Sequence, residues 1–274
     1  MKRFLSGVIT TLSLIVCLSV ASPVIAQTVT SVPATPGASV SQSVELKNLF
    51  RNQLEQYQLA EREYDLYKQQ YKQLQTLASL ERAVQATRAV LIRRSEVLTT
   101  YFDLLFDQLK TAPGIDPAKQ QELNQEITEL VENLRSQKIQ AEAVADKQAV
   151  ADFADNFELL RPQILATSYK TRAYLQVGAY QDLFIRSQVF NQEIKAYQAT
   201  DSASTFKQTA RTRAYLETDA QDQLVGQALM ATLEALSSSK NYNETWYNSL
   251  QENLVGLQSG LEKLYAFLLE LTNY

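Results

Sequence analysis

The chain has 274 residues, 45% of them hydrophobic and 20% charged, a composition typical of globular proteins that excludes a disordered secreted chain. Its formal net charge is −4, which disfavours nucleic acid or an anionic membrane surface as the main partner, because phosphate binding requires concentrated Lys and Arg. It contains no histidine, so catalysis by an imidazole acid or base is excluded as well.

Residues 1–26 have the pattern of a secretory signal peptide. Lys2 and Arg3 supply the positive start, Phe4–Val20 is an apolar run diluted by Ser and Thr, and cleavage is predicted after Ala26. We therefore expect a secreted or periplasmic protein. The apolar run is close to the lower length limit of a membrane span, so a retained signal anchor is the alternative. Only that anchor would attach the chain to a membrane.

Residues 27–43 are rich in Thr, Ser, Val, Pro and Ala, lack a helical stripe, and are predicted to form a flexible lead-in. The only cysteine, Cys17, lies in the leader, so the mature fold is held together by packing without disulfides. From Ser43 onward Gly and Pro nearly vanish, and apolar residues recur at spacings of three and four. This pattern predicts an all-α protein.

The first helix is predicted over residues 44–110. Its early apolar positions recur every seven residues at Phe50, Tyr57, Tyr64 and Tyr71, and its later ones at Leu77, Val84, Leu91, Leu98 and Leu105. The heptad phase changes between residues 74 and 80, which predicts local overwinding or a change of partner helices. A helix of about 100 Å is too long to be covered by one compact core.

The second helix is predicted over residues 117–200, after the turn residues Pro113-Gly114. Asp116 suits its N-cap and Pro117 its first position. Pro162 lies inside the pattern and predicts a kink or a break. A third helix is expected over residues 204–237.

The last helix has the most regular pattern of the chain, and Asn241 with Glu244 is expected to form the capping box at its start. Its leucines alternate at spacings of four and three: Leu250, Leu254, Leu257, Leu261, Leu264, Leu268 and Leu271. This narrow seam predicts the core of a helical bundle, with a homodimeric zipper as the alternative.

The first two helices, paired antiparallel about the turn at residues 111–116, place Tyr67 opposite Leu160 and Tyr71 opposite Phe157. The same register brings Arg94 near two carboxylates of the second helix, Glu129 and Glu132. We therefore predict an antiparallel long-helix bundle, in which a four-helix head is joined to a projecting coiled-coil hairpin. The head consists of residues 44–79 together with 146–274, and the two-helix stalk of residues 80–145.

No catalytic, cofactor-binding or metal-binding residue is predicted. Without His, and with no Cys after the leader, nucleophile triads, zinc sites and di-iron bundles have no ligands or bases. The chain has no phosphate-binding glycine loop, and its paired carboxylates are neighbours on solvated helix faces rather than acids across a cleft. An oxygen-only Ca²⁺ site stays possible, although no Asp-x-Asp-x-Asp-Gly loop is present. We expect neither an enzyme nor a cofactor.

Two clusters are candidates for binding. The first is an apolar stalk tip, whose side chains point all around the helix and would contact a partner protein or a second copy: Tyr101, Phe102, Leu105, Phe106 and Leu109. The second is a row of tyrosines that could line a small-ligand or peptide site between the head helices: Tyr57, Tyr64, Tyr67 and Tyr71. The simpler interpretation of the tyrosines is a bundle core.

These observations predict an exported, non-enzymatic scaffold or adaptor that makes protein–protein contacts through coiled-coil surfaces and the apolar tip. The alternatives are a helical-bundle module that binds a small ligand or peptide, and a holdase-like periplasmic chaperone. A signal peptide followed by long helical hairpins is similar in architecture to the periplasmic tentacle chaperones. Those proteins are basic, whereas this chain is acidic, and no motif assigns it to their family.

Overall fold

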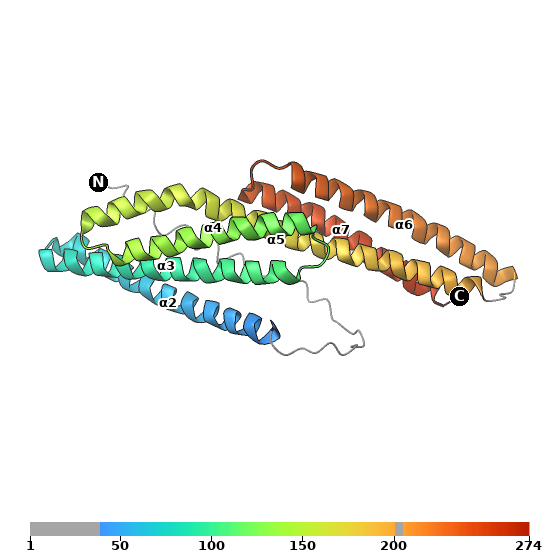
Figure 1. Cartoon of the computed structure of the whole chain (residues 1–274), viewed down its shortest axis with the longest axis horizontal. Helices are drawn as coiled ribbons and strands as arrows, with labels where there is room; N and C mark the ends of the chain where they lie inside the picture. Colours follow the sequence, from blue (N-terminus) through green and yellow to red (C-terminus); the bar gives the residue numbers. More distant parts are fainter. Residues whose placement is uncertain (1–38, 201–204, 274) are drawn as a thin grey trace. The chain divides into compact units, whose positions relative to one another are not determined.

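The computed structural model describes residues 39–200 and 205–273, and the predicted signal peptide lies outside them. Within these two ranges the regular structure is entirely helical, which confirms the all-α prediction. The described helices are α2 (Ser39–Leu74), α3 (Leu77–Thr111), α4 (Pro117–Glu142), α5 (Lys147–Ala199), α6 (Thr205–Ser238) and α7 (Glu244–Leu271) (Figure 1). In this part of the chain no helix is long and apolar enough to cross a membrane.

The prediction of one helix over residues 44–110 is wrong, because the chain breaks between α2 and α3. Gln75 has a φ of 52°, in the left-handed region, and its N–H donates to the Tyr71 carbonyl at 3.0 Å, as at many helix ends. Thr76 and Ser79 then cap α3 reciprocally. The Ser79 N–H donates to Thr76 Oγ1 at 3.2 Å, and the Thr76 N–H donates to Ser79 Oγ at 3.1 Å. The break lies where the heptad phase changes.

The second predicted helix is also interrupted, between the end of α4 and Lys147. Asp146 caps the start of α5, where its Oδ1 accepts a hydrogen bond from the Ala149 N–H at 2.9 Å. Pro162 lies inside α5, and this helix continues through it to Ala199. Of the two outcomes predicted at Pro162, a kink or a break, the break is therefore wrong.

Short polar side chains cap the starts of α4 and α7. The prediction of Asp116 as the N-cap of α4 is confirmed, since its Oδ1 accepts from the Ala118 N–H at 2.9 Å. The prediction that Asn241 caps the last helix is wrong by two residues. The N-cap of α7 is Asn243, which accepts from the Trp246 N–H at 2.9 Å.

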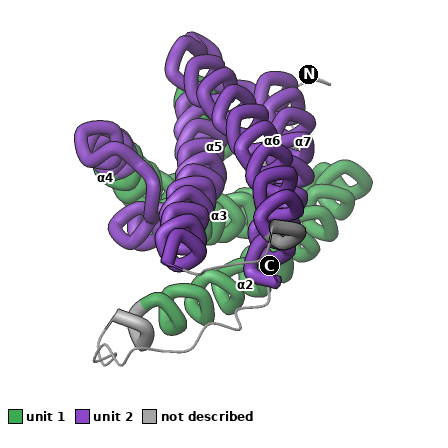
Figure 2. Tube along the Cα trace, turned by 90° about the vertical axis from the view of Figure 1, so that its right-hand side faces the viewer, with its two compact units in different colours: residues 1–104, 128–162 green, residues 105–127, 163–274 purple. Residues whose placement is uncertain are grey.

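The helices gather into two compact units, coloured separately in Figure 2. Of the described residues, unit 1 contains 39–104 and 128–162, and unit 2 contains 105–127, 163–200 and 205–273. Helices α3, α4 and α5 each contribute one part to each unit. The predicted four-helix head and two-helix stalk are not confirmed, and the unit boundaries do not coincide with theirs.

In unit 1, α2 runs back along α3. The rings of Phe50 and Tyr101 have centroids 6.3 Å apart, and these residues lie equally far in sequence from the turn at residues 75–76. Helix α4 joins α3 through an ion pair of 2.9 Å between Lys138 and Glu96. The core is apolar with two tyrosines: Tyr57, Ala60, Tyr64, Val90, Leu91, Val97, Leu98, Leu130, Leu134, Phe153 and Phe157.

Glu96 provides a test of this α3–α4 contact through pH. Burial alone would raise the pKa of its carboxyl, but hydrogen bonds from Lys138 and Arg93 lower the pKa overall. A carboxyl with a lowered folded-state pKa stabilises the fold above its unfolded pKa and loses that contribution as pH falls through the folded value. We expect Glu96→Gln to cost about 1 kcal/mol of unfolding free energy at pH 7, since its side chain is only 16% exposed.

The difference between Glu96→Gln and wild type should shrink to zero as pH falls through that folded value, measured by urea unfolding at several pH values. Glu252→Gln on α7 changes the same kind of side chain at an exposed position outside these ion pairs and serves as the control. A pH-independent difference for Glu96→Gln would contradict an ion-pair role.

In unit 2, α5, α6 and α7 form a three-helix bundle. Helix α6 runs antiparallel to α5, with Lys195 Nζ 2.8 Å from Asp219 Oδ1. Helix α7 turns back along α6, and the Gln221 side-chain amide donates to the Gly260 carbonyl at 3.0 Å. The Tyr265 hydroxyl reaches across to α5 and donates to a backbone carbonyl there at 2.9 Å.

The leucine seam of α7 lies inside this bundle. Its members are all buried: Leu250, Leu254, Leu257, Leu261, Leu264, Leu268 and Leu271. Tyr247 extends the seam by one turn, and its hydroxyl donates to Gln176 Oε1 of α5 at 3.2 Å. The seam therefore forms part of the bundle core within one chain, as predicted. Its leucines are buried there, so they are not available to form a homodimeric zipper.

Candidate functional site

The structure covers much of the predicted apolar tip within the monomer. Phe102, Leu105 and Leu109 are buried, and Tyr101 and Phe106 are half-buried. The Tyr101 ring contacts those of Phe102, at a centroid distance of 5.1 Å, and Phe50. The five side chains therefore do not form one exposed patch.

The predicted tyrosine row divides into two halves. Tyr57 and Tyr64 are each 2% exposed, whereas Tyr67 and Tyr71 are half-buried. Burial raises the pKa of Tyr64 to about 12, and that of Tyr57 further. Both phenols are neutral at physiological pH. Tyr57 donates a short hydrogen bond to Glu61, so its hydroxyl is used within unit 1.

Beside Tyr57 lies the only fully buried cation among the described side chains, Arg94, which is 1% exposed. Its guanidinium carbon is 3.4 Å from the ring centroid of Phe157 and 5.9 Å from that of Phe153. Burial lowers the pKa of Arg94 to about 10, against the opposing effects of Tyr57, Glu158 and other acidic groups. The guanidinium thus stays charged at neutral pH and stacks on a ring, a cation–π contact in a desolvated place.

The Arg94 contacts correct the predicted register. Tyr71 was expected opposite Phe157, but Phe157 covers Arg94, and the phenol at that level is Tyr57. Fourteen residues along α2 separate Tyr57 from Tyr71, a distance of about 21 Å. Since Tyr57, Arg94 and Phe157 come from α2, α3 and α5, the cluster ties three helices of unit 1 together. We assign it a structural role.

The feature of unit 2 that could receive a ligand is an open groove with a volume of about 1470 Å³. Its lining comes from α5, from α6, and from the α3–α4 turn with the first turn of α4. Its lining extends along α5 from Tyr174 to Gln188 and along α6 from Asp222 to Ser237. These stretches of helix measure about 21 and 22 Å.

The groove is lined by apolar side chains and by amides. The apolar ones include Ile115, Tyr174, Phe184, Ile185, Met230 and Leu233, and the amides are Gln181, Gln188, Gln223 and Gln227. Met230 is 68% and Ile185 47% exposed, so they offer apolar surface to solvent. Gly226 lets the Phe184 ring lie close to the backbone of α6, because a Cβ there would lie 3.3 Å from that ring.

A tight contact between two glycines positions the α3–α4 turn at the edge of the groove. Gly114 has a φ of +71°, and a Cβ built on it would lie 2.1 Å from the carbonyl oxygen of Gly178 in α5. A Cβ on Gly178 would in turn lie 2.9 Å from the Pro113 carbonyl oxygen. Backbone therefore rests on backbone, which brings Ile115 and Asp116 to the groove wall.

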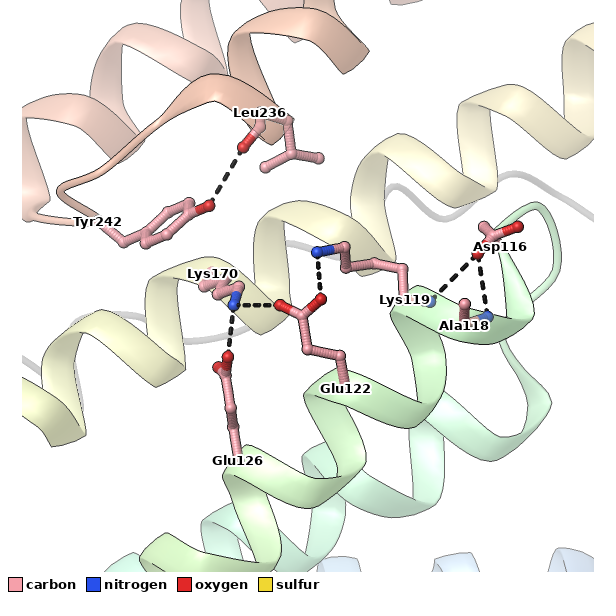
Figure 3. A network of polar contacts seen from close by, with 8 residues as sticks. All are labelled: Asp116, Ala118, Lys119, Glu122, Glu126, Lys170, Leu236 and Tyr242. Carbon is pink, nitrogen blue, oxygen red and sulfur yellow. Dashed lines mark hydrogen bonds and ion pairs between the residues drawn. The ribbon is translucent and has the colours of Figure 1, made fainter.

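Next to the groove, ion pairs fasten the start of α4 to α5, as Figure 3 shows. Lys170 Nζ lies 2.9 Å from Glu122 Oε1 and 2.6 Å from Glu126 Oε1, and Glu122 also binds Lys119. Hydrogen bonds from Lys119 and Lys170 lower the pKa of Glu122. Burial would lower the pKa of Lys170, but its two carboxylate partners raise it overall. The network therefore pairs two lysines with two glutamates, equal numbers of basic and acidic side chains.

The groove has few charged side chains among its lining residues. It holds three carboxylates, Asp116, Asp222 and Glu234, one ammonium, Lys119, and neutral side chains. Within residues 39–200 and 205–273, no group of three or more acidic side chains is arranged to hold a metal ion. The arrangement can bind an apolar chain and donate or accept hydrogen bonds along it.

Sequence reasoning missed this groove. Its lining comes from three separate segments, and α5 and α6 carry apolar residues on several faces, so no single stripe marked it. The available signal was Gly226 among large side chains and the repeated Gln on both helices. Comparison with protein-family models, curated proteins and solved structures finds no match for this chain.

Proposed function

We propose that this protein is a non-enzymatic helical adaptor, exported from the cytoplasm, that binds an amphipathic helix of a partner protein in the α5–α6 groove. The observation that carries the proposal is the size and lining of the groove. A helix about 10–12 Å across with a 5.4 Å pitch occupies roughly 400–600 Å³ per turn. A volume of about 1470 Å³ therefore accommodates about three turns of helix. The lined stretches of α5 and α6 are each about as long as four turns.

The lining also favours a helix over a small molecule. Most small-ligand pockets enclose roughly 300–1,000 Å³ and bury the ligand, whereas this groove is larger and open along one side. An amphipathic helix places apolar residues at i, i+3, i+4 and i+7, which would cover Ile185 and Met230. The glutamines would then hydrogen-bond polar side chains at the edge of the bound helix.

The other functions considered for this chain are supported less. The tyrosine row is a weaker ligand site, because Tyr57 and Tyr64 are buried and Tyr57 is bonded to Glu61. The apolar tip is a weaker partner surface, because Phe102 and Leu109 are inaccessible. A holdase-like chaperone would use the same groove, but it would bind apolar segments regardless of their order.

Binding to the groove is tested with a fluorescent synthetic peptide of about 18 residues, helical and with leucines on one face, titrated with the full chain and followed by anisotropy. We expect saturable binding that weakens at least about tenfold in the double variant Ile185→Gln with Met230→Gln, since both apolar contacts are lost. Both side chains are exposed, so the fold should tolerate the changes.

Leu216→Gln is the matched control, because it removes an equally exposed apolar side chain from α6 outside the groove. It should leave the affinity unchanged. A scrambled peptide of the same composition separates an adaptor, which should bind it weakly, from a holdase, which should bind it equally well. Equal binding by wild type and the double variant would overturn the proposal.

A further inference from the structure

If the groove binds a helix as proposed above, the charges around the groove indicate which charge that helix carries. We infer that the partner helix is basic, with two Lys or Arg side chains about three turns apart that meet carboxylates at the two ends of the groove. The carboxylates belong to Asp222 at one end and to Glu234 and Asp116 at the other.

The positions of these groups follow from the antiparallel pairing of α5 and α6. Asp222 faces Gln188, whose amide donates to it at 3.4 Å. Glu234 lies twelve residues further along α6, about 18 Å away, toward the end where the α3–α4 turn rests on Gly178. Asp116 lies in that turn. Acidic groups therefore stand at both ends of the groove, and the apolar side chains lie between them.

The cation that lines the groove does not offset these charges. The Lys119 ammonium pairs with Glu122 and lies over the Tyr174 ring, 5.5 Å from its centroid. In the described part of the chain, neither Asp222 nor Glu234 forms an ion pair with Lys or Arg. The rim is therefore negative, and the net charge of the whole chain, −4, has the same sign. Both effects favour a cationic partner and repel an anionic one.

The spacing of the carboxylates converts into a sequence pattern for the partner. A separation of about 18 Å along the groove corresponds to about 11 or 12 residues of a helix lying in it. Residues 11 apart lie on nearly the same face, since three turns of 3.6 residues make 10.8. Lys and Arg side chains bury their alkyl stems on apolar surface while the charge reaches outward, which suits the ends of an apolar groove.

The test compares three helical peptides of about 18 residues with an identical leucine face. They carry Lys, Gln or Glu at the same two positions, about 11 residues apart, and are titrated with the full chain by fluorescence anisotropy at low and at high salt. We expect the Lys peptide to bind about tenfold more tightly than the Gln peptide, and the Glu peptide to bind most weakly. High salt should reduce these differences.

The double variant Asp222→Asn with Glu234→Gln should remove the preference for the Lys peptide without abolishing binding of the Gln peptide. The control variant Glu252→Gln with Glu262→Gln removes the same charge from exposed positions on α7 and should keep the preference. Equal affinity for all three peptides would overturn the basic partner and leave the helix-binding groove in place. Binding of none of them would overturn both.

A second copy of this chain is the other occupant that the test must distinguish. Mass determination of the full chain by light scattering should give a monomer in the absence of peptide. A dimer that dissociates in Ile185→Gln with Met230→Gln would show that another copy fills the groove, and would overturn the inference.

Discussion

Replacing Gly114 by alanine should destabilise the protein by about 3 kcal/mol, the largest effect that we expect from adding one methyl group. The residue has a φ of +71°, where an L side chain costs roughly 1–2 kcal/mol. The added Cβ would also lie 2.1 Å from the Gly178 carbonyl oxygen, so the turn would have to move off α5. Urea unfolding of the full chain measures the change.

Gly178→Ala tests the other side of this contact. Alanine is favoured over glycine inside a helix by about 1 kcal/mol, yet here its Cβ would lie 2.6 Å from Ile115 Cγ1. Overpacking of this kind costs roughly 1–3 kcal/mol, so we expect a net loss of stability. Because Ile115 lines the groove, the variant should also bind helical peptides less tightly.

Gly256→Ala is the control for both substitutions, since it makes the same chemical change inside α7. A Cβ there meets nothing within 4 Å, so only the helix preference of alanine acts. We expect this variant to be more stable than wild type by about 0.5–1 kcal/mol. If the three substitutions shifted the urea midpoint alike, the contact between the turn and α5 would be wrong.

Arg94→Ala should cost about 3–5 kcal/mol of unfolding free energy. The substitution leaves a cavity beside Phe157 and removes the cation that interacts electrostatically with Tyr57, Glu61 and Glu158. Breaking a buried charged cluster on one side is costly, because the remaining polar groups lose their partner. Thermal or urea unfolding of the full chain gives the measurement.

The choice of replacement at position 94 separates packing from charge. Arg94→Met fills most of the volume without a buried charge and should recover most of the stability lost in Arg94→Ala. Arg94→Lys keeps the charge but loses the planar group that stacks on Phe157, so it should recover less. A Lys variant as stable as wild type would contradict the stacking role.

Arg93→Ala is the matched control for this series. Arg93 is the neighbour of Arg94 in sequence, but its side chain is 43% exposed and pairs with Glu96 on the same helix. Exposed pairs of this kind contribute roughly 0.2–1 kcal/mol. Replacing Arg94 by alanine should therefore lower the free energy of unfolding several times more than replacing Arg93, because Arg94 is buried and Arg93 is exposed.

Local patterns in the sequence were sufficient for much of the helical structure. The leucine seam of α7 and the N-cap at Asp116 were both predicted at the residues where they occur. In each case the determinant lies within a few neighbouring residues, either as a repeated apolar spacing or as one side-chain oxygen near a free backbone N–H. Such features depend little on the rest of the fold.

The breaks within the long helices were harder to predict, because ordinary residues make them. Gln75 adopts a conformation usually left to Gly or Asn, and Ser79 takes the position that Glu or Gln holds in a standard capping box. Conversely Pro162, the strongest helix breaker in the region, is tolerated within α5. The heptad phase change was the one signal of the break at residues 75–76.

Contacts between distant segments were beyond sequence reasoning. The heptad pattern identifies Arg94 as lying beside an apolar seam, but it does not say that Phe157 covers it. The groove depends on Gly114 meeting Gly178; the pair Pro113-Gly114 predicts a turn, but it does not say that the turn contacts Gly178. Partner choice among helices is decided by packing along the whole length, which a single repeat does not encode.

The way in which α3, α4 and α5 contribute to both units has a consequence for the order in which the chain is completed at the ribosome. Every residue of unit 1 has been synthesised once residue 162 is added. Residues 105–127 of unit 2 are synthesised before residue 162. Their own unit can form only after the unit 2 part of α5, α6 and α7 have also been synthesised. Until Gly178 emerges, the Gly114 turn has no surface to rest on, so a nascent chain of intermediate length exposes apolar side chains that the finished protein covers.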